Sequence, residues 1–348
     1  MDADELAAWL RLIETPGIGR AAARRLLAAH GSPQGAARHL PEPSEALASR
    51  VEATLSWRSG AAARHVIALG DAAYPHALLE SPDPPLLLYA IGRLELLHAP
   101  ALAIVGSRHA SVQGRQNASA FAAHLGGAGF TIVSGLALGI DGAAHEGALG
   151  SAGSTIAVVA TGLDQVYPRR HLALAGRIAA EGLLLSEHPL GTPPLRENFP
   201  QRNRIIAGLT RGTLVVEATL QSGSLITARL AVEAGREVFA IPGSIHSPQA
   251  KGCHALIKQG AKLVETAQDV LEELGVATAP APASATEPVL ERPDPLLDAM
   301  GHDPIVLDEL IARTGWSAAE LAAKLLDLEL AGRIERLPGQ RFQRIARA

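Results

Sequence analysis

From about residue 66, short apolar runs alternate with longer helical stretches along this chain. Runs such as ALAIV, STIAVVA and GTLVVEA are apolar on successive residues, which is typical of strands buried on both faces of a parallel sheet. The alternation of strand and helix predicts a doubly wound, mainly parallel α/β core. The predicted strands are His65 to Leu69, Leu86 to Ile91, Ala101 to Val105, Phe130 to Val133, Thr155 to Ala160, Gly182 to Leu185, Gly212 to Val216 and Glu237 to Ile241.

The first residues follow another pattern. Residues 4–58 form short Ala, Leu and Arg-rich helical stretches, broken at Thr15-Pro16-Gly17-Ile18-Gly19 and at Gly31-Ser32-Pro33. The first break resembles a helix-hairpin-helix, whose exposed backbone amides can hold a DNA phosphate. A plain turn between two helices, closed by glycines, explains the same residues, and both interpretations stay open here.

The last part of the chain begins after a stretch rich in proline and alanine, GVATAPAPASATEPVLERPDPLLD, which has little to bury and indicates a linker. Two helical stretches follow, with a helix N-cap expected at Trp316-Ser317, a stop at Gly332 and two short strands around Pro338-Gly339. This order predicts a winged helix. From residue 300 onward the chain has seven basic and seven acidic residues, so this module suits a protein partner as well as DNA.

These changes of pattern divide the chain into four predicted regions. They are a helical domain of the SAM or helix-hairpin-helix type (1–60), an extended Rossmann-like core (61–274), a Pro/Ala-rich linker (275–295) and a winged-helix domain (296–348).

The composition of the chain excludes some kinds of site and indicates which residues can bind an anion. The chain has 348 residues, of which 47% are hydrophobic and 19% charged, and a formal net charge of -4, so any binding of nucleic acid depends on a local patch. A single cysteine, Cys253, excludes an intrachain disulfide and a thiolate zinc site. Only four lysines occur, so arginine must supply most basic contacts. Because the N-terminus is acidic and no long apolar segment occurs, we expect a cytoplasmic protein without a membrane anchor.

A first candidate phosphate site follows the strand ALAIV. Gly106, Ser107 and Arg108 come directly after it and a helix comes next, so backbone amides and a guanidinium fork face the same edge of the sheet. The sequence has neither the G-x-G-x-x-G dinucleotide motif nor a Walker A loop. A glycine at a strand end is common, so this turn is a weak signal by itself.

A second small-residue turn, Ser134-Gly135-Leu136-Ala137-Leu138-Gly139, ends another strand and enters a helix with Asp141 and His145. Two such turns at neighbouring strand ends can form one crevice. We interpret Asp141 as a carboxylate that satisfies free backbone amides and His145 as a packing or surface side chain, in preference to catalytic roles.

The segment from Arg196 to Leu209 is the most informative. It contains Arg196, Phe199, Arg202, Asn203 and Arg204 in a protein with only 3% aromatic residues. An aromatic ring flanked by guanidinium groups is suited to single-stranded nucleic acid, because base stacking is worth about 1–3 kcal/mol per base and the arginines neutralise phosphates. A solvated basic loop with a buried phenylalanine is the alternative.

A fourth turn follows the strand GTLVVEA. Ser222, Gly223 and Ser224 would present hydroxyls and amides at a helix start, which suits an anion. Glu217, at the strand end, is awkward there unless it accepts from a base or ribose or pairs with an arginine, and we expect a pair with Arg202 or Arg204. No motif of a metalloprotease, serine hydrolase or zinc site occurs, so we expect no catalytic residues, metal or cofactor.

Seven segments in this order, VGSR, SGLALGIDGAAH, TGLDQVYPRRH, SEHPLG, FPQRNRIIAGL, VVEATLQSGSLITA and FAIPGS, resemble the DNA processing protein A family, also called DprA or Smf. The resemblance covers roughly residues 65–265. It implies an extended Rossmann core that binds and protects incoming single-stranded DNA, forms a homodimer through that core, and helps to load RecA recombinase during natural transformation, without catalysis.

The resemblance also assigns site residues. Ser107, Arg108, the Arg202-Asn203-Arg204 stretch and the Ser222-Gly223-Ser224 loop are expected to hold phosphates, with Phe199 as the stacking aromatic and Arg196 beside it. Gly106, Gly135 and Glu217 complete the candidate site. One departure is His254, which stands where the family usually has an asparagine, so a contact at this position is an open question.

Two other functions remain as alternatives. Nucleotide phosphoribohydrolases of the lysine-decarboxylase-like family share this broad Rossmann variant, but their PGGxGTxxE signature is replaced here by PGSIHSPQ. The second is a scaffold that recruits partners through the winged helix and no longer uses its anion sites.

Overall fold

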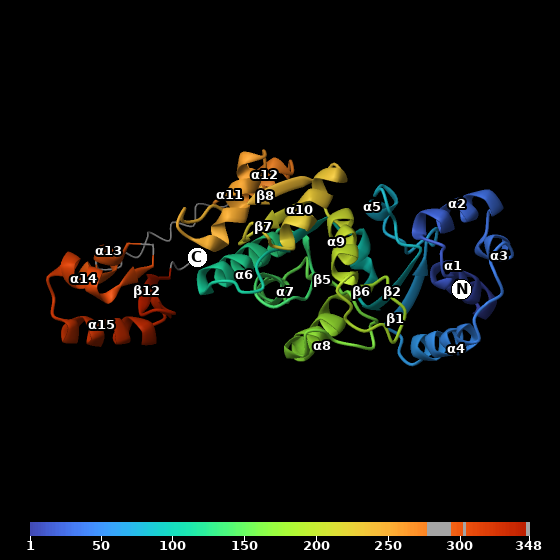
Figure 1. Cartoon of the computed structure of the whole chain (residues 1–348), viewed down its shortest axis with the longest axis horizontal. Helices are drawn as coiled ribbons and strands as arrows, with labels where there is room; N and C mark the ends of the chain where they lie inside the picture. Colours follow the sequence, from blue (N-terminus) through green and yellow to red (C-terminus); the bar gives the residue numbers. More distant parts are fainter. Residues whose placement is uncertain (277–293, 302–303, 346–348) are drawn as a thin grey trace.

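A computed structural model describes residues 1–276, 294–301 and 304–345 of the chain (Figure 1). The central part is one sheet with the strand order β1-β2-β6-β5-β4-β3-β7-β8-β9. Its strands are β1 (Arg64–Ala68), β2 (Leu87–Gly92), β3 (Ala101–Val105), β4 (Thr131–Ser134), β5 (Thr155–Val158), β6 (Leu183–Ser186), β7 (Gly212–Val215), β8 (Glu237–Ala240) and β9 (Lys262–Leu263). Neighbouring strands from β6 to β9 are parallel, whereas β1 and β2 run antiparallel to each other and β2 to β6.

Helices cover both faces of this sheet, which explains the continuous apolar runs of the central strands. Along β3, Leu102 and Ile104 pack on one face, and Ala103 and Val105 on the other. The core helices are α5 (His76–Leu79), α6 (Val112–Gly127), α7 (Ile140–Ala148), α8 (Leu172–Glu181), α9 (Asn198–Leu209), α10 (Ser224–Glu233), α11 (Lys251–Lys258) and α12 (Ala267–Glu273), with 3-10 turns η1 (Leu94–His98), η2 (Arg169–His171) and η3 (Pro248–Ala250).

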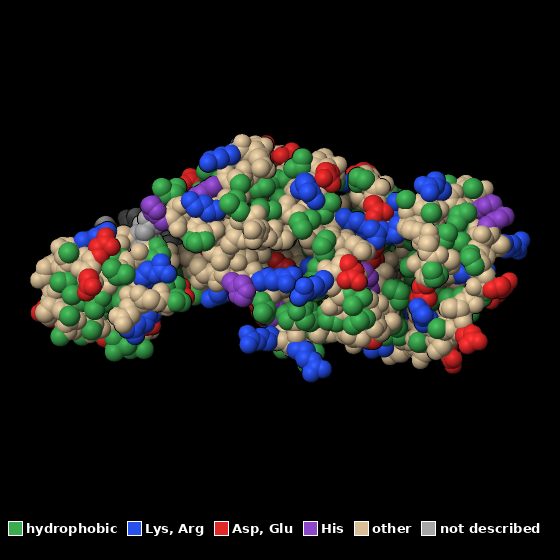
Figure 2. Space-filling view, in the orientation of Figure 1, with side chains coloured by type: hydrophobic (Ala, Val, Ile, Leu, Met, Phe, Trp, Pro, Cys, Tyr) green, Lys and Arg blue, Asp and Glu red, His purple; other side chains and the backbone are tan. Residues whose placement is uncertain are grey.

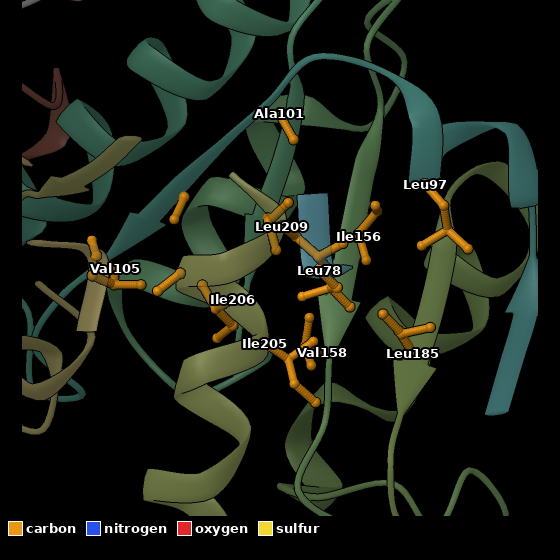
Figure 3. Close-up of a cluster of buried hydrophobic side chains, with 14 of the residues drawn as sticks. Leu78, Leu97, Ala101, Val105, Ile156, Val158, Leu185, Ile205, Ile206 and Leu209 are labelled. Carbon is orange, nitrogen blue, oxygen red and sulfur yellow. The ribbon is translucent and has the colours of Figure 1, made fainter. Parts of the chain in front are cut away.

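The face of the sheet under α9 and α10 is the one that bears on the candidate site. Ile205, Ile206 and Leu209 of α9 are buried against side chains of the central strands such as Val105 and Val158 (Figure 3). Because the buried side of α9 is anchored in this way, its position relative to the strand ends is fixed.

The N-terminal helical domain consists of α1 (Ala3–Glu14), α2 (Arg20–His30), α3 (Pro33–Ala37) and α4 (Ala46–Ser59), as predicted. It shares a hydrophobic cluster with the antiparallel end of the sheet, where Leu10 and Leu12 join Leu87. The Trp57 ring meets the Tyr89 ring edge-on, with centroids 6.1 Å apart. The domain therefore lies against the β1–β2 end of the core (Figure 1).

The C-terminal domain is the predicted winged helix. It consists of α13 (Pro295–Met300), β10 (Ile305–Val306), α14 (Leu307–Thr314), α15 (Ala318–Leu330), β11 (Ile334–Leu337) and β12 (Arg341–Arg344), with the sheet order β10-β12-β11. Ser317 caps α15 in a reciprocal capping box with Glu320, and Gly332 has a φ of +66° after the helix, so both predicted signals are confirmed.

All predicted strands are present, with ends shifted by one or two residues. The sequence analysis missed β9 and β10, which have only two residues each, and both residues of β9 are exposed. The predicted linker (275–295) lies almost wholly outside the described residues, and the exact domain boundaries stay a prediction. Within the described ranges, no helix has the length and apolar character needed to cross a membrane.

Candidate nucleic-acid interface

A pocket of about 780 Å³ opens at the carboxyl ends of β3 and β7, beside α9. This is the edge where a doubly wound sheet usually binds its ligand. Most of the predicted site residues line it, namely Gly106, Ser107, Arg108, Arg196, Phe199, Arg202, Asn203, Ser222, Gly223 and Ser224. Gly135, Arg204, Glu217 and His254 do not belong to its lining.

The turn after β3 is built around a glycine. A Cβ at Gly106 would lie 2.6 Å from the side chain of Ile140 and 2.9 Å from the carbonyl oxygen of Glu217, so only glycine fits. Ser107 is buried, and its hydroxyl accepts a hydrogen bond from the amide of His109 at 3.1 Å. Arg108 projects outward and is exposed. The turn therefore holds the arginine backbone in place and leaves its guanidinium group at the mouth of the pocket.

Three side chains from separate segments of the chain meet at this mouth, and Phe199 among them belongs to the first turn of α9. The guanidinium carbon of Arg108 lies 5.3 Å from the centroid of the Phe199 ring, and the ring of Tyr167 meets Phe199 edge-on at 5.8 Å. Phe199 is half-buried and Tyr167 is 44% exposed, so both rings keep an accessible surface. This is an aromatic platform with a cation beside it. Sequence analysis missed Tyr167, although an aromatic residue close to two arginines, in a chain so poor in aromatics, was an available signal.

Basic side chains surround the platform. Arg108 and Arg196 make no ion pair within the described residues, and the same holds for Arg169 and Arg170, which follow Tyr167 in η2. All of these arginines are exposed. Figure 2 shows Lys and Arg side chains gathered on the surface between α9 and α8. The patch is the local positive surface that a chain with a net charge of -4 needs for binding an anionic polymer.

Arg202, only two residues from the exposed Pro200, is 5% exposed and lies under the floor of the pocket. Its Nη1 donates to the carbonyl oxygens of Gly135, at 2.6 Å, and Val158, while its Nε donates to the side chain of Asn203 at 3.1 Å. Burial lowers the pKa of Arg202 to about 10, which leaves the group charged at neutral pH. Arg202 thus adds positive charge beneath the pocket and ties the Gly135 loop to α9.

The buried groups behind the Gly135 loop act as its supports. Asp141 accepts hydrogen bonds from the amides of Gly135 and Ala137 at 3.1 and 3.3 Å, and burial raises its pKa. His145 Nε2 accepts from the amide of Leu136 at 3.3 Å and Nδ1 donates to Thr155 at 2.7 Å, because the Thr155 hydroxyl itself donates to Ile132. Burial lowers the pKa of His145 to about 3, so it is neutral. The predicted contact of Asp141 with backbone amides is confirmed, and His145 is a buried packing side chain and not a surface one.

The expected pairing of Glu217 with Arg202 or Arg204 is wrong. The Glu217 carboxylate accepts from the amide of Ser111 at 2.9 Å and from its hydroxyl at 2.5 Å. Ser111 is the N-cap of α6, so Glu217 fastens the start of that helix. The carboxylate also occupies the space where a Cβ on Gly114 would lie. The negative charge of Glu217 is therefore held at the N-terminus of α6, where the helix dipole stabilises it.

Arg204 faces away from the pocket. Its guanidinium group pairs with Asp83 at 2.8 Å and with Glu187 at 2.5 Å. Two arginines of α2, Arg20 and Arg24, pair with the same Asp83 at 2.8 and 2.5 Å. We call these five side chains the Asp83 cluster. Burial opposes ionisation of Asp83, but the charges of Arg204 and Arg20 and the hydrogen bonds of Arg24 and Arg20 hold its pKa below the ordinary value. The cluster joins the helical domain to α9.

Of the remaining predicted residues, those of the Ser222-Gly223-Ser224 loop line the pocket and His254 lies outside its lining. In the loop before α10, the Ser222 and Ser224 hydroxyls lie 2.6 Å apart, and both residues line the pocket with Gly223. His254, on α11, forms a hydrogen bond with the carbonyl oxygen of Gly243 at 3.0 Å and stays outside the pocket lining. The sequence analysis also missed four polar residues of the lining, His109, Thr219, Thr227 and Gln249.

Comparison with known proteins adds three family matches. Residues 65–275 match the model of DNA recombination-mediator protein A, residues 277–340 the DprA winged helix domain, and residues 3–59 the DprA-like N-terminal HHH domain. Protein Smf of Escherichia coli is 44% identical over 308 residues, covering 86% of this chain and 82% of that protein. DNA processing protein DprA of Streptococcus pneumoniae is 52% identical over 203 residues, covering 58% and 72%.

Two solved structures are also similar to this chain. The X-ray structure of DNA processing protein A from Streptococcus pneumoniae has a TM-score of 0.67 and 40% identity, covering 78% of this chain and 98% of that one. A structure described as giving insights into the single-stranded DNA binding mode of DNA processing protein A from Helicobacter pylori has a TM-score of 0.55 and 32% identity, covering 60% and 95%.

Proposed function

This chain belongs to the DNA recombination-mediator protein A family, the family of the DprA and Smf proteins, and on that premise we propose that its pocket binds single-stranded DNA. The observation that carries the proposal is the platform at the pocket mouth, where Arg108 lies over Phe199 and Tyr167 meets the same ring. The Helicobacter pylori relative, whose single-stranded DNA binding mode has been described, supports it.

Each part of the pocket has a role in this proposal. A base stacks on Phe199, which is worth about 1–3 kcal/mol per base whatever its identity. Its phosphates are held by Arg108 and Arg196 and by the Ser222 to Ser224 turn at the start of α10. A volume of about 780 Å³ is in the range of pockets that hold a small organic ligand, and so accommodates a splayed-out nucleotide.

The strand continues beyond the pocket. Arg169 and Arg170 are exposed next to Tyr167 and make no ion pair within the described residues, so they can meet the neighbouring phosphates. Gly135 and Arg202 act from below by shaping the pocket floor. Arg204, Glu217 and His254 support the site indirectly in this proposal. Arg204 holds α9 in the Asp83 cluster, Glu217 fastens the start of α6, and His254 bonds the carbonyl oxygen of Gly243.

We assign no chemical step to this site, consistent with a family of recombination mediators. A nucleotide hydrolase would need a free carboxylate at the pocket. Both oxygens of Glu217 are bonded to Ser111, and Asp141 bonds backbone amides. Release of free base from a nucleotide by the pure protein, abolished by Glu217→Gln, would overturn this assignment.

The wider role follows from the family. We propose that the protein protects incoming DNA, helps to load RecA recombinase during natural transformation in the cytoplasm, and acts as a homodimer through its Rossmann core. Exposed Val232, Ile245 and Leu263, on elements near the β8–β9 end of the sheet, supply apolar surface suited to such a dimer. Sedimentation equilibrium of wild type and Leu263→Asp tests this, and a monomer at all concentrations contradicts it.

The binding proposal is tested with a labelled single strand and a duplex of equal length across a salt series. We expect tighter binding of the single strand and a log–log salt slope of about -0.7 for each phosphate contacted. Equal, weak binding of the two nucleic acids would show that the strand contact is not in this pocket.

A further inference from the structure

Helix α15 of the winged helix carries a second apolar face that no described part of the chain covers. Its exposed residues Ala319, Ala322, Ala323, Leu326 and Leu330 fall on one side of a helix with 3.6 residues per turn. Leu326 is 54% and Leu330 79% exposed. We call this the α15 stripe, and Figure 2 shows hydrophobic side chains along the lower edge of this domain, where α15 lies in Figure 1.

The opposite side of the same helix already forms the core of the domain. Leu321, Leu325 and Leu328 are buried with Leu310 and Phe342. The α15 stripe is therefore not needed for folding, and leucines on a helix with two apolar faces point to a partner on the second face.

The charges beside the stripe indicate what kind of partner fits. Glu320 and Asp327 border it on one side and Glu329 on the other, while Lys324 lies toward the Trp316 ring, 5.2 Å from its centroid. Both borders are thus acidic. An acidic border around an apolar stripe is complementary to a helix with apolar residues at the centre and basic residues on both sides.

Two other occupants of the α15 stripe, duplex DNA and a second copy of the chain, fit it poorly. Duplex DNA is usually read by the second helix of such a module in the major groove, but the acidic borders of α15 repel phosphates. Three basic side chains of this domain lie instead on the β11–β12 hairpin, at Arg336, Arg341 and Arg344. A second copy of the chain would bring acidic borders against acidic borders, because a symmetric contact uses the same patch twice.

We propose that the α15 stripe docks an amphipathic helix of a partner protein, with leucine-like residues at i, i+4 and i+7 flanked by Lys or Arg. The surface is separate from the DNA pocket, and the proposal does not depend on DNA binding. It assigns the winged helix a protein-binding role through α15.

The test uses the full chain and a fluorescein-labelled helical peptide with leucines at i, i+4, i+7 and i+11 and arginines on both sides. Fluorescence anisotropy compares this peptide with one that has glutamates in place of the arginines and with a scrambled peptide of the same composition. We expect the arginine-flanked peptide to bind at least tenfold tighter than either of the others, with an affinity that falls as salt rises.

The variant Leu326→Gln/Leu330→Gln should weaken peptide binding at least tenfold, while Leu79→Gln, an exposed leucine of α5 in the core, should not. Because Leu326 and Leu330 are exposed, the thermal midpoint should shift by less than about 2 °C. Single-stranded DNA binding should stay unchanged, so failure of the DNA proposal would be seen separately.

Several results would overturn the inference. One is equal binding of the arginine-flanked and scrambled peptides, and another is unchanged peptide binding by the leucine variant. Loss of self-association in that variant would identify a second copy as the occupant, and loss of duplex binding would identify DNA.

Discussion

Two arginine-rich regions lie on opposite sides of α9 and use the same side chain in opposite ways. At the pocket mouth, Arg108 and Arg196 are exposed and make no ion pair within the described residues. In the Asp83 cluster, Arg204 is paired with two carboxylates and its side chain is only 13% exposed. A guanidinium group that must bind phosphate has to keep its donors free, whereas one that joins two domains has its donors occupied.

The comparison also explains how a protein with a net negative charge can bind a polyanion. Acidic residues neutralise arginine where the domains meet, and Ser111 binds the carboxylate of Glu217, which stays outside the pocket lining. Positive charge is therefore concentrated where the strand is expected to lie.

Loss of the stacking ring should have a large effect on binding in the pocket. Phe199→Ala should weaken single-strand binding by about 5- to 100-fold, because one stacked base contributes about 1–3 kcal/mol. The salt slope should stay the same, since no phosphate contact is removed. Fluorescence anisotropy across a salt series measures both quantities, and Phe199→Trp is the matched control that keeps a ring. An unchanged affinity of the alanine variant would show that the base does not stack here.

Removing the shared carboxylate should affect stability instead. Asp83→Asn leaves Arg20, Arg24 and Arg204 with one anionic partner fewer, in a half-buried setting, and should lower the free energy of unfolding by about 1–2 kcal/mol. Urea unfolding measures this. Strand affinity should change less than threefold. A large loss of binding with unchanged unfolding would reverse the roles assigned to the two regions.

A smaller effect is expected outside the pocket. Arg169→Ala and Arg170→Ala should each weaken binding of a long strand by about fourfold and reduce the salt slope by about 0.7. The control is Arg211→Ala, an exposed arginine just before β7 at the amino edge of the sheet. If the control lowers the slope equally, the effect reflects total charge and not the position beside Tyr167.

The smallest effect is a pH dependence of the Asp83 cluster. Because the folded-state pKa of Asp83 is held below its ordinary value of 3.8, its stabilisation is complete above that pH and is lost as the pH falls through the lower value. The difference in unfolding free energy between wild type and Asp83→Asn should thus be constant from pH 5 to 8 and shrink below about pH 3.8. A difference that grows on acidification would contradict this sign.

Much of the fold follows from local pattern. Buried strands reveal themselves as apolar runs, and Ser317 and Gly332 mark the ends of α15 in the sequence. β9 could not be predicted in this way, because Lys262 and Leu263 form too short a strand to show a pattern.

The site was predictable in its residue types and less so in their contacts. Phe199 and Arg108 were found from chemistry and family resemblance. The partner of Glu217 lies 106 residues away in sequence, and that of Arg204 lies 121 residues away at Asp83. Such pairs depend on the assembled fold, so no local spacing could show which arginines stay free.

The most direct test of the contrast measures Arg108→Ala and Arg204→Ala side by side, each for single-strand affinity and for urea unfolding. We expect Arg108→Ala to bind about 10- to 100-fold more weakly with unchanged stability, because a charged hydrogen bond is worth about 1.5–3 kcal/mol. Arg204→Ala should bind within threefold of wild type but lose about 3 kcal/mol of stability, because Glu187 is left buried without its partner. If Arg204→Ala loses strand binding while remaining stable, or Arg108→Ala binds like wild type, the division between binding and structural arginines is contradicted.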